Sequence, residues 1–520
     1  MKLQGGAGGG GASGGAGAID QSHRTQQLRR FKAVNQTDSR TGIEDDEFAW
    51  LENAMPIGFG QIRVTPAQSA AIGTYAGGIA SIWGLVLGTT PYIYAVGTDG
   101  SIQQFTTTGA LTQVCGAATV TTKARLILWQ STPILIIDAN GYFSWDGTTF
   151  KSLGGTTSAP SSGVAIAVFE GRVWIVGGTN NRTITFSAPA SYTDFTAADG
   201  GGSAGITDSN FQGAIQQLNS SLETLWVVGQ GAVNSISNVT ISGSTTSFSN
   251  TNVVANIGSS APASVLGYFR SLAFRSPFGE YALVGVTPQK LSDKLDGLFP
   301  MLSTMSGDNP AAICVIYDLL VLLILTTYTD PVLGNRPLMI GFSQGKWFFA
   351  SPNMATSGLI WITSLLNAGN PQAWGTDGTN IFQLFVASNT AAVKYKIQSK
   401  LYDFGLSTTS KECFKMGVEI QAPASINPTV TVDTEASNSI VNLSLQNILQ
   451  WVNNANQQIT FLGLGNQPIV WISTGLILAK ATVQAFGFFL GWTISGSDTP
   501  WTLQAVQQEY AMRREWDTAA

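Results

Sequence analysis

The fold is decided by the pattern of residues 134–148, which read ILIIDANGYFSWDGT. Four apolar residues end at an Asp-Ala-Asn-Gly turn, four largely aromatic residues follow, and Asp146-Gly147 ends the unit. Short runs of β-branched and aromatic residues are typical of strands, and Asp-Gly pairs supply the positive φ that tight hairpins need. The stretch therefore predicts an antiparallel hairpin of short strands.

The same unit recurs on both sides of this stretch, from about residue 75 to about residue 390. Its turns centre near residues 99, 139, 171, 230, 279, 334 and 377. Such spacing suits one four-stranded unit for each turn, and about six or seven units would close into a β-propeller. No long 3.6-residue period is present, which argues against a parallel α/β sheet. The pattern predicts an all-β propeller of six or seven blades; a row of β-sandwich domains is the alternative.

The chain has few charges for its length: 520 residues, 11% charged, with a formal net charge of −5. Ordinary soluble domains are about 25% charged. The surface must therefore be solvated by Ser, Thr, Asn, Gln and Gly, or be partly covered by other subunits. There is no basic excess to neutralise a phosphate backbone, which argues against tight binding of nucleic acid.

Sequence motifs for cofactors, metals and membrane spans are weak or missing. The single histidine, His23, excludes an HExxH zinc site, and three widely spaced cysteines predict reduced core residues. The Gly6-Gly8-Gly11 spacing follows no strand, so it predicts no dinucleotide site. The apolar run 311–325 carries Asp318 at its middle and predicts two buried strands around a turn. We therefore expect no cofactor, no resident metal and no membrane span.

Changes in composition divide the chain into four parts. Residues 1–18 predict a disordered Gly-rich tail, and residues 19–74 an extended arm and entry segment, with a short helix over 26–32 as one expectation. Residues 75–392 predict the propeller. Residues 393–520 have longer alternating strands and predict an antiparallel, sandwich-like C-terminal β domain.

Carboxylates scattered through the blades leave an enzymatic function open. A propeller glycosidase needs two carboxyl groups about 5 to 9.5 Å apart. The candidates are Asp138, Glu170, Glu223, Glu280 and Asp318. Spacing along the chain does not tell whether any two converge, and turn residues are the simpler interpretation. A carbohydrate-binding propeller or glycosidase is thus the alternative function, and we expect no catalytic residues.

Two segments go beyond a generic β pattern. The first is 50–56, WLENAMP, with Gly60 and Arg63; the second is 491–497, GWTISGS, continued from Trp501 to Trp516. Together they resemble the entry segment and the C-terminal strand of the tail nozzle family of short-tailed phages, also called tail tubular protein B or packaged-DNA stabilisation proteins. The glycine tract at the N-terminus is a departure from that family.

The resemblance implies a structural virion protein, not an enzyme, assembled in the host cytoplasm into the phage tail. Such a protein forms a ring, usually a homohexamer, below the adaptor ring that joins the portal. Its lumen continues the channel for double-stranded DNA and helps retain the packaged genome until ejection, while fibres, spikes or a needle attach to it. A wall with few cations suits a conduit, because each phosphate contact slows transit. The candidate partner-binding residues are Arg24, Arg29, Arg30, Trp50, Arg513, Arg514 and Trp516.

Overall fold

The computed structural model describes residues 23–515 except positions 59, 179, 222, 306–307, 352–357, 424, 444, 446–447, 450, 453–457, 460–470 and 473–475. Across these residues the regular structure is strands and four short 3-10 helices, so no described helix is long and apolar enough to cross a membrane. The helices are η1 (Ala197–Asp199), η2 (Pro262–Ser264), η3 (Asp293–Leu295) and η4 (Phe299–Met301). The predicted tail, residues 1–18, lies outside the described residues.

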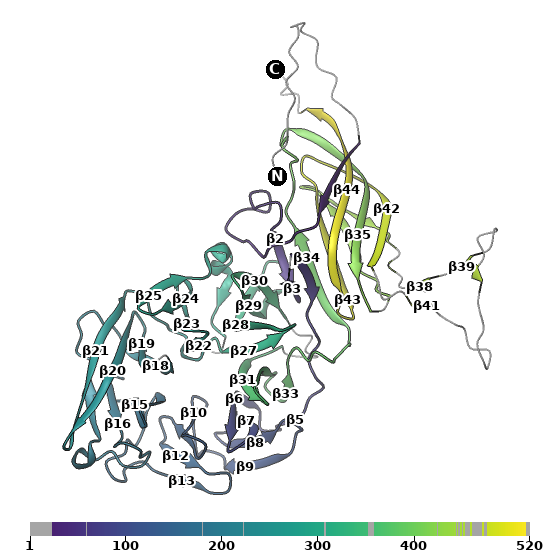
Figure 1. Ribbon diagram of the computed structural model, residues 1–520. Helices are drawn as coiled ribbons and strands as arrows, with labels where there is room; N and C mark the ends of the chain where they lie inside the picture. Colours follow the sequence, from purple (N-terminus) through teal and green to yellow (C-terminus); the bar gives the residue numbers. More distant parts are fainter. Residues whose placement is uncertain are drawn as a thin grey trace, which may run out of the picture.

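Most of the described strands form four-stranded antiparallel blades (Figure 1). The first blade is β6 (Ile79–Leu87), β7 (Thr90–Gly97), β8 (Ile102–Thr106) and β9 (Leu111–Cys115). The second is β10 (Arg125–Leu128), β11 (Ile134–Ile137), β12 (Tyr142–Trp145) and β13 (Phe150–Ser152). The third is β14 (Ala165–Phe169), β15 (Arg172–Gly177), β16 (Thr183–Phe186) and β17 (Gly202–Gly205).

Four further blades follow. The fourth is β18 (Ile215–Ser221), β19 (Thr224–Gly229), β20 (Ala232–Ser242) and β21 (Thr245–Ala255). The fifth is β22 (Leu266–Tyr268), β23 (Ser271–Ser276), β24 (Gly279–Val284) and β25 (Thr287–Lys290). The sixth is β27 (Ala311–Ile316), β28 (Leu319–Asp330), β29 (Gly334–Ser343) and β30 (Lys346–Ala350), with β26 (Leu302–Ser303) also on β28. The seventh is β31 (Trp361–Asn367), β32 (Asn370–Thr376), β33 (Asn380–Gln383) and β5 (Gly73–Thr74).

The blades close into a ring. The first strand of each blade contacts the first strand of the next, and β31 lies beside β6 (Figure 1). The seventh blade is completed by β5, which precedes the first blade in the chain and pairs antiparallel with β33, Thr74 opposite Asn380. Gly73 is required in this strand because a Cβ there would lie 2.6 Å from the Phe105 ring. The described fold is thus an all-β propeller of seven blades, which confirms the predicted fold class.

The positions of the turns explain the irregular spacing in the sequence. Six of the seven predicted centres lie at or next to the hairpin between the second and third strands of a blade. The centre near residue 171 instead lies between β14 and β15, the first two strands of the third blade, whose second hairpin spans 178–182. The repeat is therefore more regular than the predicted centres suggested.

Two further predictions about the core are confirmed. Cys115, Cys314 and Cys413 are free and buried. The apolar run 311–325 forms β27 and part of β28, joined by a turn at Asp318, whose φ is 61°. Both strands belong to blade six.

The remaining strands build a two-sheet sandwich against blade six. One sheet, here called the outer sheet, has the order β3-β4-β44-β35-β42, with β1 also on β44. The other, the junction sheet, continues blade six in the order β30-β2-β34-β43-β36-β37. The strands are β1 (Arg24–Leu28), β2 (Phe48–Glu52), β3 (Ala54–Ile57), β4 (Gln61–Val64), β34 (Val393–Ser399), β35 (Thr409–Gln421), β36 (Thr429–Asp433), β37 (Asn438–Val441), β42 (Leu476–Gly487), β43 (Gly491–Asp498) and β44 (Thr502–Glu515).

Short strand pairs lie between β37 and β42 in the chain. They are β38 (Ile448–Leu449) with β41 (Trp471–Ile472), and β39 (Trp451–Val452) with β40 (Gln458–Ile459).

The sandwich is built from both ends of the chain. Residues 24–64, predicted as an extended arm and entry segment, contain four strands of its two sheets. The helix expected over 26–32 is wrong, because β1 pairs along its length with β44, Arg24 opposite Tyr510 and Leu28 opposite Val506. Backbone pairing to a long neighbour outweighs a weak local helix preference.

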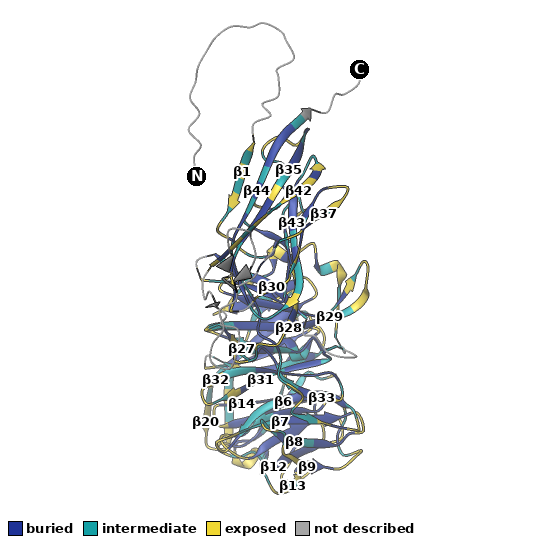
Figure 2. Cartoon of the chain, turned by 90° about the vertical axis from the view of Figure 1, so that its right-hand side faces the viewer, coloured by how far each residue is buried: buried dark blue, intermediate teal, exposed yellow. Residues whose placement is uncertain are grey.

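A continuous apolar core joins the two parts. Trp347 of blade six, Trp492 of β43 and Met416 of β35 are all buried in one cluster. Figure 2 shows buried strands running from the blades into the sandwich without a break. The propeller and the sandwich are therefore packed as one body rather than linked by a free segment.

Candidate functional site

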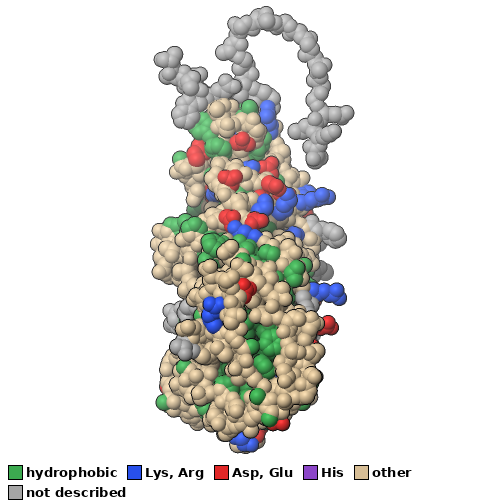
Figure 3. Space-filling view, turned by 90° about the vertical axis from the view of Figure 1, so that its left-hand side faces the viewer, with side chains coloured by type: hydrophobic (Ala, Val, Ile, Leu, Met, Phe, Trp, Pro, Cys, Tyr) green, Lys and Arg blue, Asp and Glu red, His purple; other side chains and the backbone are tan. Residues whose placement is uncertain are grey.

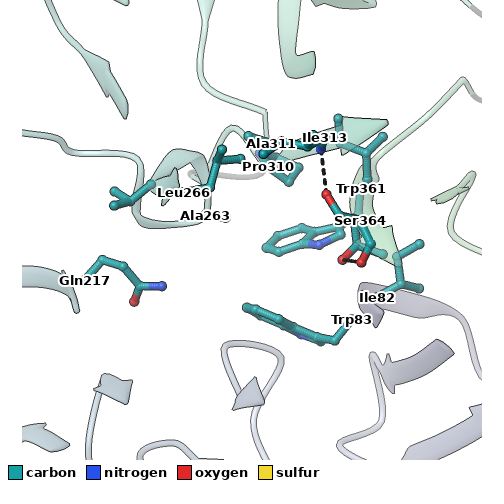
Figure 4. Close-up of a pocket in the computed structure, with 13 residues that line it drawn as sticks. Ile82, Trp83, Gln217, Ala263, Leu266, Pro310, Ala311, Ile313, Trp361 and Ser364 are labelled. Carbon is teal, nitrogen blue, oxygen red and sulfur yellow. Dashed lines mark hydrogen bonds between the residues drawn. The ribbon is translucent and has the colours of Figure 1, made fainter. Parts of the chain in front are cut away.

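The axis of the propeller holds a small uncharged cavity of about 190 Å³. First strands line it, with Trp83 from β6, Gln217 from β18, Ile313 from β27 and Trp361 from β31. The two tryptophan rings lie 6.2 Å apart, and Gln217 faces them across the cavity (Figure 4). The Ile313 amide donates to Ser364 Oγ at 2.6 Å. This lining can hold a small neutral molecule but offers no acid or base.

One mouth of the axis is charged but internally balanced. A cavity of about 510 Å³ there is lined by Lys123, Arg125, Asp138 and Asp308, among others. The buried Asp308 carboxylate accepts from Lys123 Nζ at 2.8 Å and from Arg125 at 3.0 Å. Asp138 accepts backbone N–H groups of its own turn, from Asn140 at 2.8 Å and Gly141 at 3.0 Å. Both carboxylates are thus already hydrogen-bonded within the protein.

The other candidate carboxylates serve hairpins or an ion pair. Glu170, Glu223 and Asp318 stand at first hairpins with φ of 49°, 57° and 61°. Glu280 is buried on β24 and accepts from Arg275 of β23 at 2.7 Å. Burial raises the pKa of Glu280, opposed by the Arg275 charge. Within the described residues no group of three or more His, Cys, Asp or Glu side chains could hold a metal ion.

The first resemblance segment forms a polar junction between propeller and sandwich. Glu52 of β2 accepts two hydrogen bonds from Arg336 of β29, at 2.6 and 2.9 Å, and one from Trp50 Nε1 at 2.8 Å. Burial alone would raise the pKa of Glu52, but the hydrogen bonds and charge of Arg336 outweigh it and lower that pKa. The Trp50 ring is buried, 4.4 Å from Phe349 and 5.4 Å from Tyr328. This residue, predicted to bind a partner, is therefore part of the junction itself.

Asn53 joins three strands at the same place. Its side chain donates to the carbonyls of Ser351 and Lys394, at 2.8 and 2.7 Å, and accepts from the Ser351 amide at 2.8 Å. Its own amide donates to Phe349 at 2.8 Å. The φ of Asn53 is 52°, a region that asparagine tolerates better than most residues. The side chain thus ties the end of blade six to β34 of the sandwich.

The last residues of the segment continue the contact. The Arg63 guanidinium lies 3.9 Å from the centre of the Tyr317 ring in the β27–β28 turn, and Tyr317 donates to the Val64 carbonyl at 2.5 Å. Gly60 has φ 92°, and a Cβ there would lie 3.1 Å from the Phe31 amide nitrogen. Trp50, Glu52, Asn53 and Arg63 therefore contribute to the junction, whereas Gly60 lies against the backbone of Phe31.

The junction also borders a surface cavity of about 630 Å³. One wall is the tip of the β28–β29 hairpin, where Val332 and Leu333 are 89% and 71% exposed. The opposite wall includes Lys394 and Lys396 of β34.

The remaining predicted partner-binding residues that the structure describes lie on or next to β1 and β44 of the outer sheet. Arg24 lies in β1 opposite Tyr510, Arg29 approaches Glu419 at 3.4 Å, and Arg30 is exposed just after β1. Arg513 donates to Glu412 at 2.6 Å and lies 5.1 Å from the Phe414 ring centre. The backbone of Arg514 is in β44, whereas Trp516 lies outside the described residues.

Sequence reasoning missed two functional positions at the junction and one buried charge. Asn53 lies in the segment 50–56, but the sequence predicted no role for it. Arg336 could not be recognised from its own neighbourhood because its partner, Glu52, is far away in the chain. Lys411 is fully buried, and its Nζ donates to the carbonyls of Leu406, Thr409 and Phe488. The alternating pattern of a strand does not show that three backbone carbonyls surround a buried ammonium group.

Lys411 predicts a pH dependence of stability. Burial lowers the pKa of Lys411 to about 8, from an ordinary value near 10.5. Relative to the unfolded chain, the folded state therefore disfavours the charged amine, so stability should rise from pH 8 to pH 10.5, by on the order of 3 kcal/mol from this group. Urea unfolding at several pH values should show a smaller rise for Lys411→Met than for wild type. The exposed Lys415→Met should keep the wild-type slope, and equal slopes in all three proteins would contradict the prediction.

The surface is poor in charge, and the charges are unevenly placed. Figure 3 shows a face that is mostly uncharged over the blades, with acidic and basic side chains gathered over the sandwich. The polar character of the blades comes instead from Ser, Thr, Asn and Gln, as on the exposed strands β20 and β21.

Comparisons with known proteins bear on the fold alone. No protein-family model matches this sequence, and no curated protein matches it. A streptogramin B lyase structure is similar over 59% of this chain and 93% of its own, with 10% identity and a TM-score of 0.35. The WD40 repeats of RRP9 are similar over 62% of this chain and 100% of their own, with 10% identity and a TM-score of 0.38. The computationally designed Ika8 protein is similar over 61% and 100%, with 11% identity and a TM-score of 0.35. At such scores the blade assignment rests on the strand pairing described above.

Proposed function

We propose that this chain is a structural subunit of the ring at the distal end of a short phage tail. The observation that carries the proposal is the joint role of the two resemblance segments. Residues 50–64 and 491–515 are more than 400 positions apart, yet their strands are hydrogen-bonded neighbours: β4 pairs with β44, and β34 lies between β2 and β43. Both segments thus build one rigid sandwich on one blade.

A rigid two-part body suits a ring subunit. Ring contacts close only at a fixed rotation between copies, which a hinged molecule would not maintain. Here the junction is held by an ion pair, by the Asn53 hydrogen bonds and by a shared apolar core. In the proposed particle the adaptor ring lies on the portal side, and fibres, spikes or a needle attach to this protein.

The low charge suits a conduit for double-stranded DNA. The formal net charge is −5, and the face over the blades carries few charged side chains (Figure 3). A wall that offers few unpaired cations releases few counterions and holds a sliding duplex weakly. The proposed role is therefore to contain and pass the genome without gripping it.

Ring formation tests the proposal directly. We expect the purified full-length chain to form a closed ring in negative-stain images and a single high-mass species by mass photometry. A protein that remains monomeric at tens of micromolar would contradict the proposed function.

Weak, salt-insensitive binding of duplex DNA is a second expected outcome. Each phosphate contact contributes about −0.9 to the slope of log affinity against log salt. Fluorescence anisotropy with a 30-base-pair duplex between 50 and 200 mM NaCl should give a slope no steeper than about −2. A slope of log affinity against log salt near −5, which corresponds to about six phosphate contacts, would contradict the proposal of a wall that binds DNA weakly.

The second candidate function is a carbohydrate-binding propeller. The Trp83 and Trp361 rings at the axial cavity favour it, because flat aromatic faces stack on sugar rings. A glycan array would test it, with Trp83→Ala as the control variant. Glycan binding by a monomeric protein, lost in that variant, would support this candidate against the ring.

A further inference from the structure

The outer sheet has two edges that are open in the described part of the chain. One edge is β1, which pairs only with β44, and the other is β42, whose strand partner is β35. Near its far end β42 is approached by Ser439, which donates to the Gln484 carbonyl at 3.2 Å. The stretch from Leu476 to Thr482 is the open part of that edge.

The open stretch of β42 carries little of the usual protection of a sheet edge: one lysine, Lys480, and a bulge between Thr482 and Ala485. It contains no proline and one charge, Lys480, in residues 476–487. Leu476 and Leu478 are 55% and 62% exposed, and Phe486 is 53% exposed. Natural proteins normally blunt a long edge with charges, proline or a bulge, because unpaired N–H and C=O groups recruit another strand.

The directions of the strands make the two edges complementary. β1 is antiparallel to β44, β44 to β35, and β35 to β42. A second copy placed beside β42 in the same orientation would present its β1 antiparallel to β42. The sheet would then continue across the contact, with neighbouring strands still running in opposite directions, as an antiparallel ladder requires.

The register also brings Arg24 to the end of β42 at which an acidic side chain lies. Arg24 pairs with Tyr510, Tyr510 with Cys413, and Cys413 with Ala485 of β42. Arg24 and Ala485 therefore lie at the same height across the sheet. Just beyond β42, Glu435 accepts from the amides of Phe488 and Phe489 at 2.8 and 3.1 Å. In the continued sheet, Arg24 of one copy would therefore lie opposite Ala485, a few residues along the chain from the Glu435 contact of its neighbour.

We infer that neighbouring copies of this chain join edge to edge, β42 of one copy pairing antiparallel with β1 of the next. This contact is heterologous, since two different edges meet, and it closes into a ring when the rotation per copy allows. The inference rests on the proposed ring function and names the surface that makes the ring.

A designed disulfide tests the pairing. Gln27 pairs with Gln507, Gln507 with Gly417, and Gly417 with Lys480. Gln27 and Lys480 therefore lie at the same height across the sheet. Within one chain these positions are three strand spacings apart, about 14 Å, too far for a disulfide. Full-length Q27C/K480C should therefore form covalent multimers under mild oxidation, seen as a ladder on a non-reducing gel. The single variants, and Q27C combined with L366C on blade seven, should form no ladder.

Edge-blocking substitutions give a second measurement. Thr482 is level with Thr25 of β1, and Leu478 lies just beyond the end of β1. L478K/T482K changes only exposed side chains, so it should keep the wild-type melting temperature but weaken association at least ten-fold by mass photometry. L366K makes the same change at a residue 54% exposed on blade seven and should associate like wild type.

The outcomes separate this inference from the proposed function. If Q27C/K480C forms rings without cross-links, and L478K/T482K associates like wild type, edge pairing is overturned and the ring function still stands. A wild-type chain that stays monomeric would overturn both.

Discussion

Arg275→Met should lower the free energy of unfolding by about 3–5 kcal/mol at pH 7, because it leaves the buried Glu280 carboxylate without its cation. The two residues stand directly opposite each other on β23 and β24. Their side chains are 9% and 1% exposed, so water cannot replace the lost partner. Urea unfolding followed by tryptophan fluorescence measures the loss.

The same variant should recover stability in acid. Burial raises the pKa of Glu280 above its ordinary value, and removal of Arg275 raises it further. A carboxyl group whose folded pKa is raised binds its proton more tightly in the folded state. The deficit of Arg275→Met relative to wild type should therefore shrink as the pH falls from 7 toward 4.5. A deficit independent of pH would show that the loss comes from packing instead.

The double variant R275M/E280M is the matched control. Removal of both charges leaves no unpaired carboxylate, so it should be more stable than Arg275→Met alone. This outcome would also show that Glu280, one of the carboxylates considered for catalysis, serves to balance the charge of Arg275 within the blade.

Asn53→Ala should cost about 3–4 kcal/mol, the second large effect. The change removes three side-chain hydrogen bonds to Ser351 and Lys394 and leaves alanine at φ 52°. Each buried hydrogen bond contributes about 1 kcal/mol, and a non-glycine residue in this region costs about 1 kcal/mol more. Because Asn53 ties blade six to β34, calorimetry should also show the single unfolding transition of the wild type broaden or split.

Asn53→Gly separates the two contributions. Glycine accepts a positive φ without strain, so this variant should lose the hydrogen bonds alone and be about 1 kcal/mol more stable than Asn53→Ala. If both variants unfold like wild type, Asn53 does not hold the junction.

Local patterns predicted most of the propeller. Hairpins such as 134–148 can be recognised in the sequence because a strand, its turn and the next strand are adjacent in the chain. Their residue types indicate the local backbone conformation. The run 311–325 was predicted for the same reason. The predicted turn near residue 171 is present, but it joins the first two strands of its blade, whereas the other six predicted turns lie between the second and third strands.

Long-range pairing was beyond such patterns. Nothing local shows that Gly73-Thr74 completes the seventh blade, 306 positions before its partner Asn380. The strand at 24–28 has a sequence that a helix also tolerates, and only its pairing with β44 makes it a strand.

The sequence by itself determined that this protein is an all-β, charge-poor molecule of repeated hairpins, because composition and short-range periodicity are properties of the chain before it folds. Only the tertiary structure decided that both ends of the chain share one sandwich, and that Glu52 meets Arg336 and Asn53 meets Lys394. The physical reason is the same in each case. A contact between residues hundreds of positions apart depends on how the blades close and stack, and no residue carries that information in its own neighbourhood.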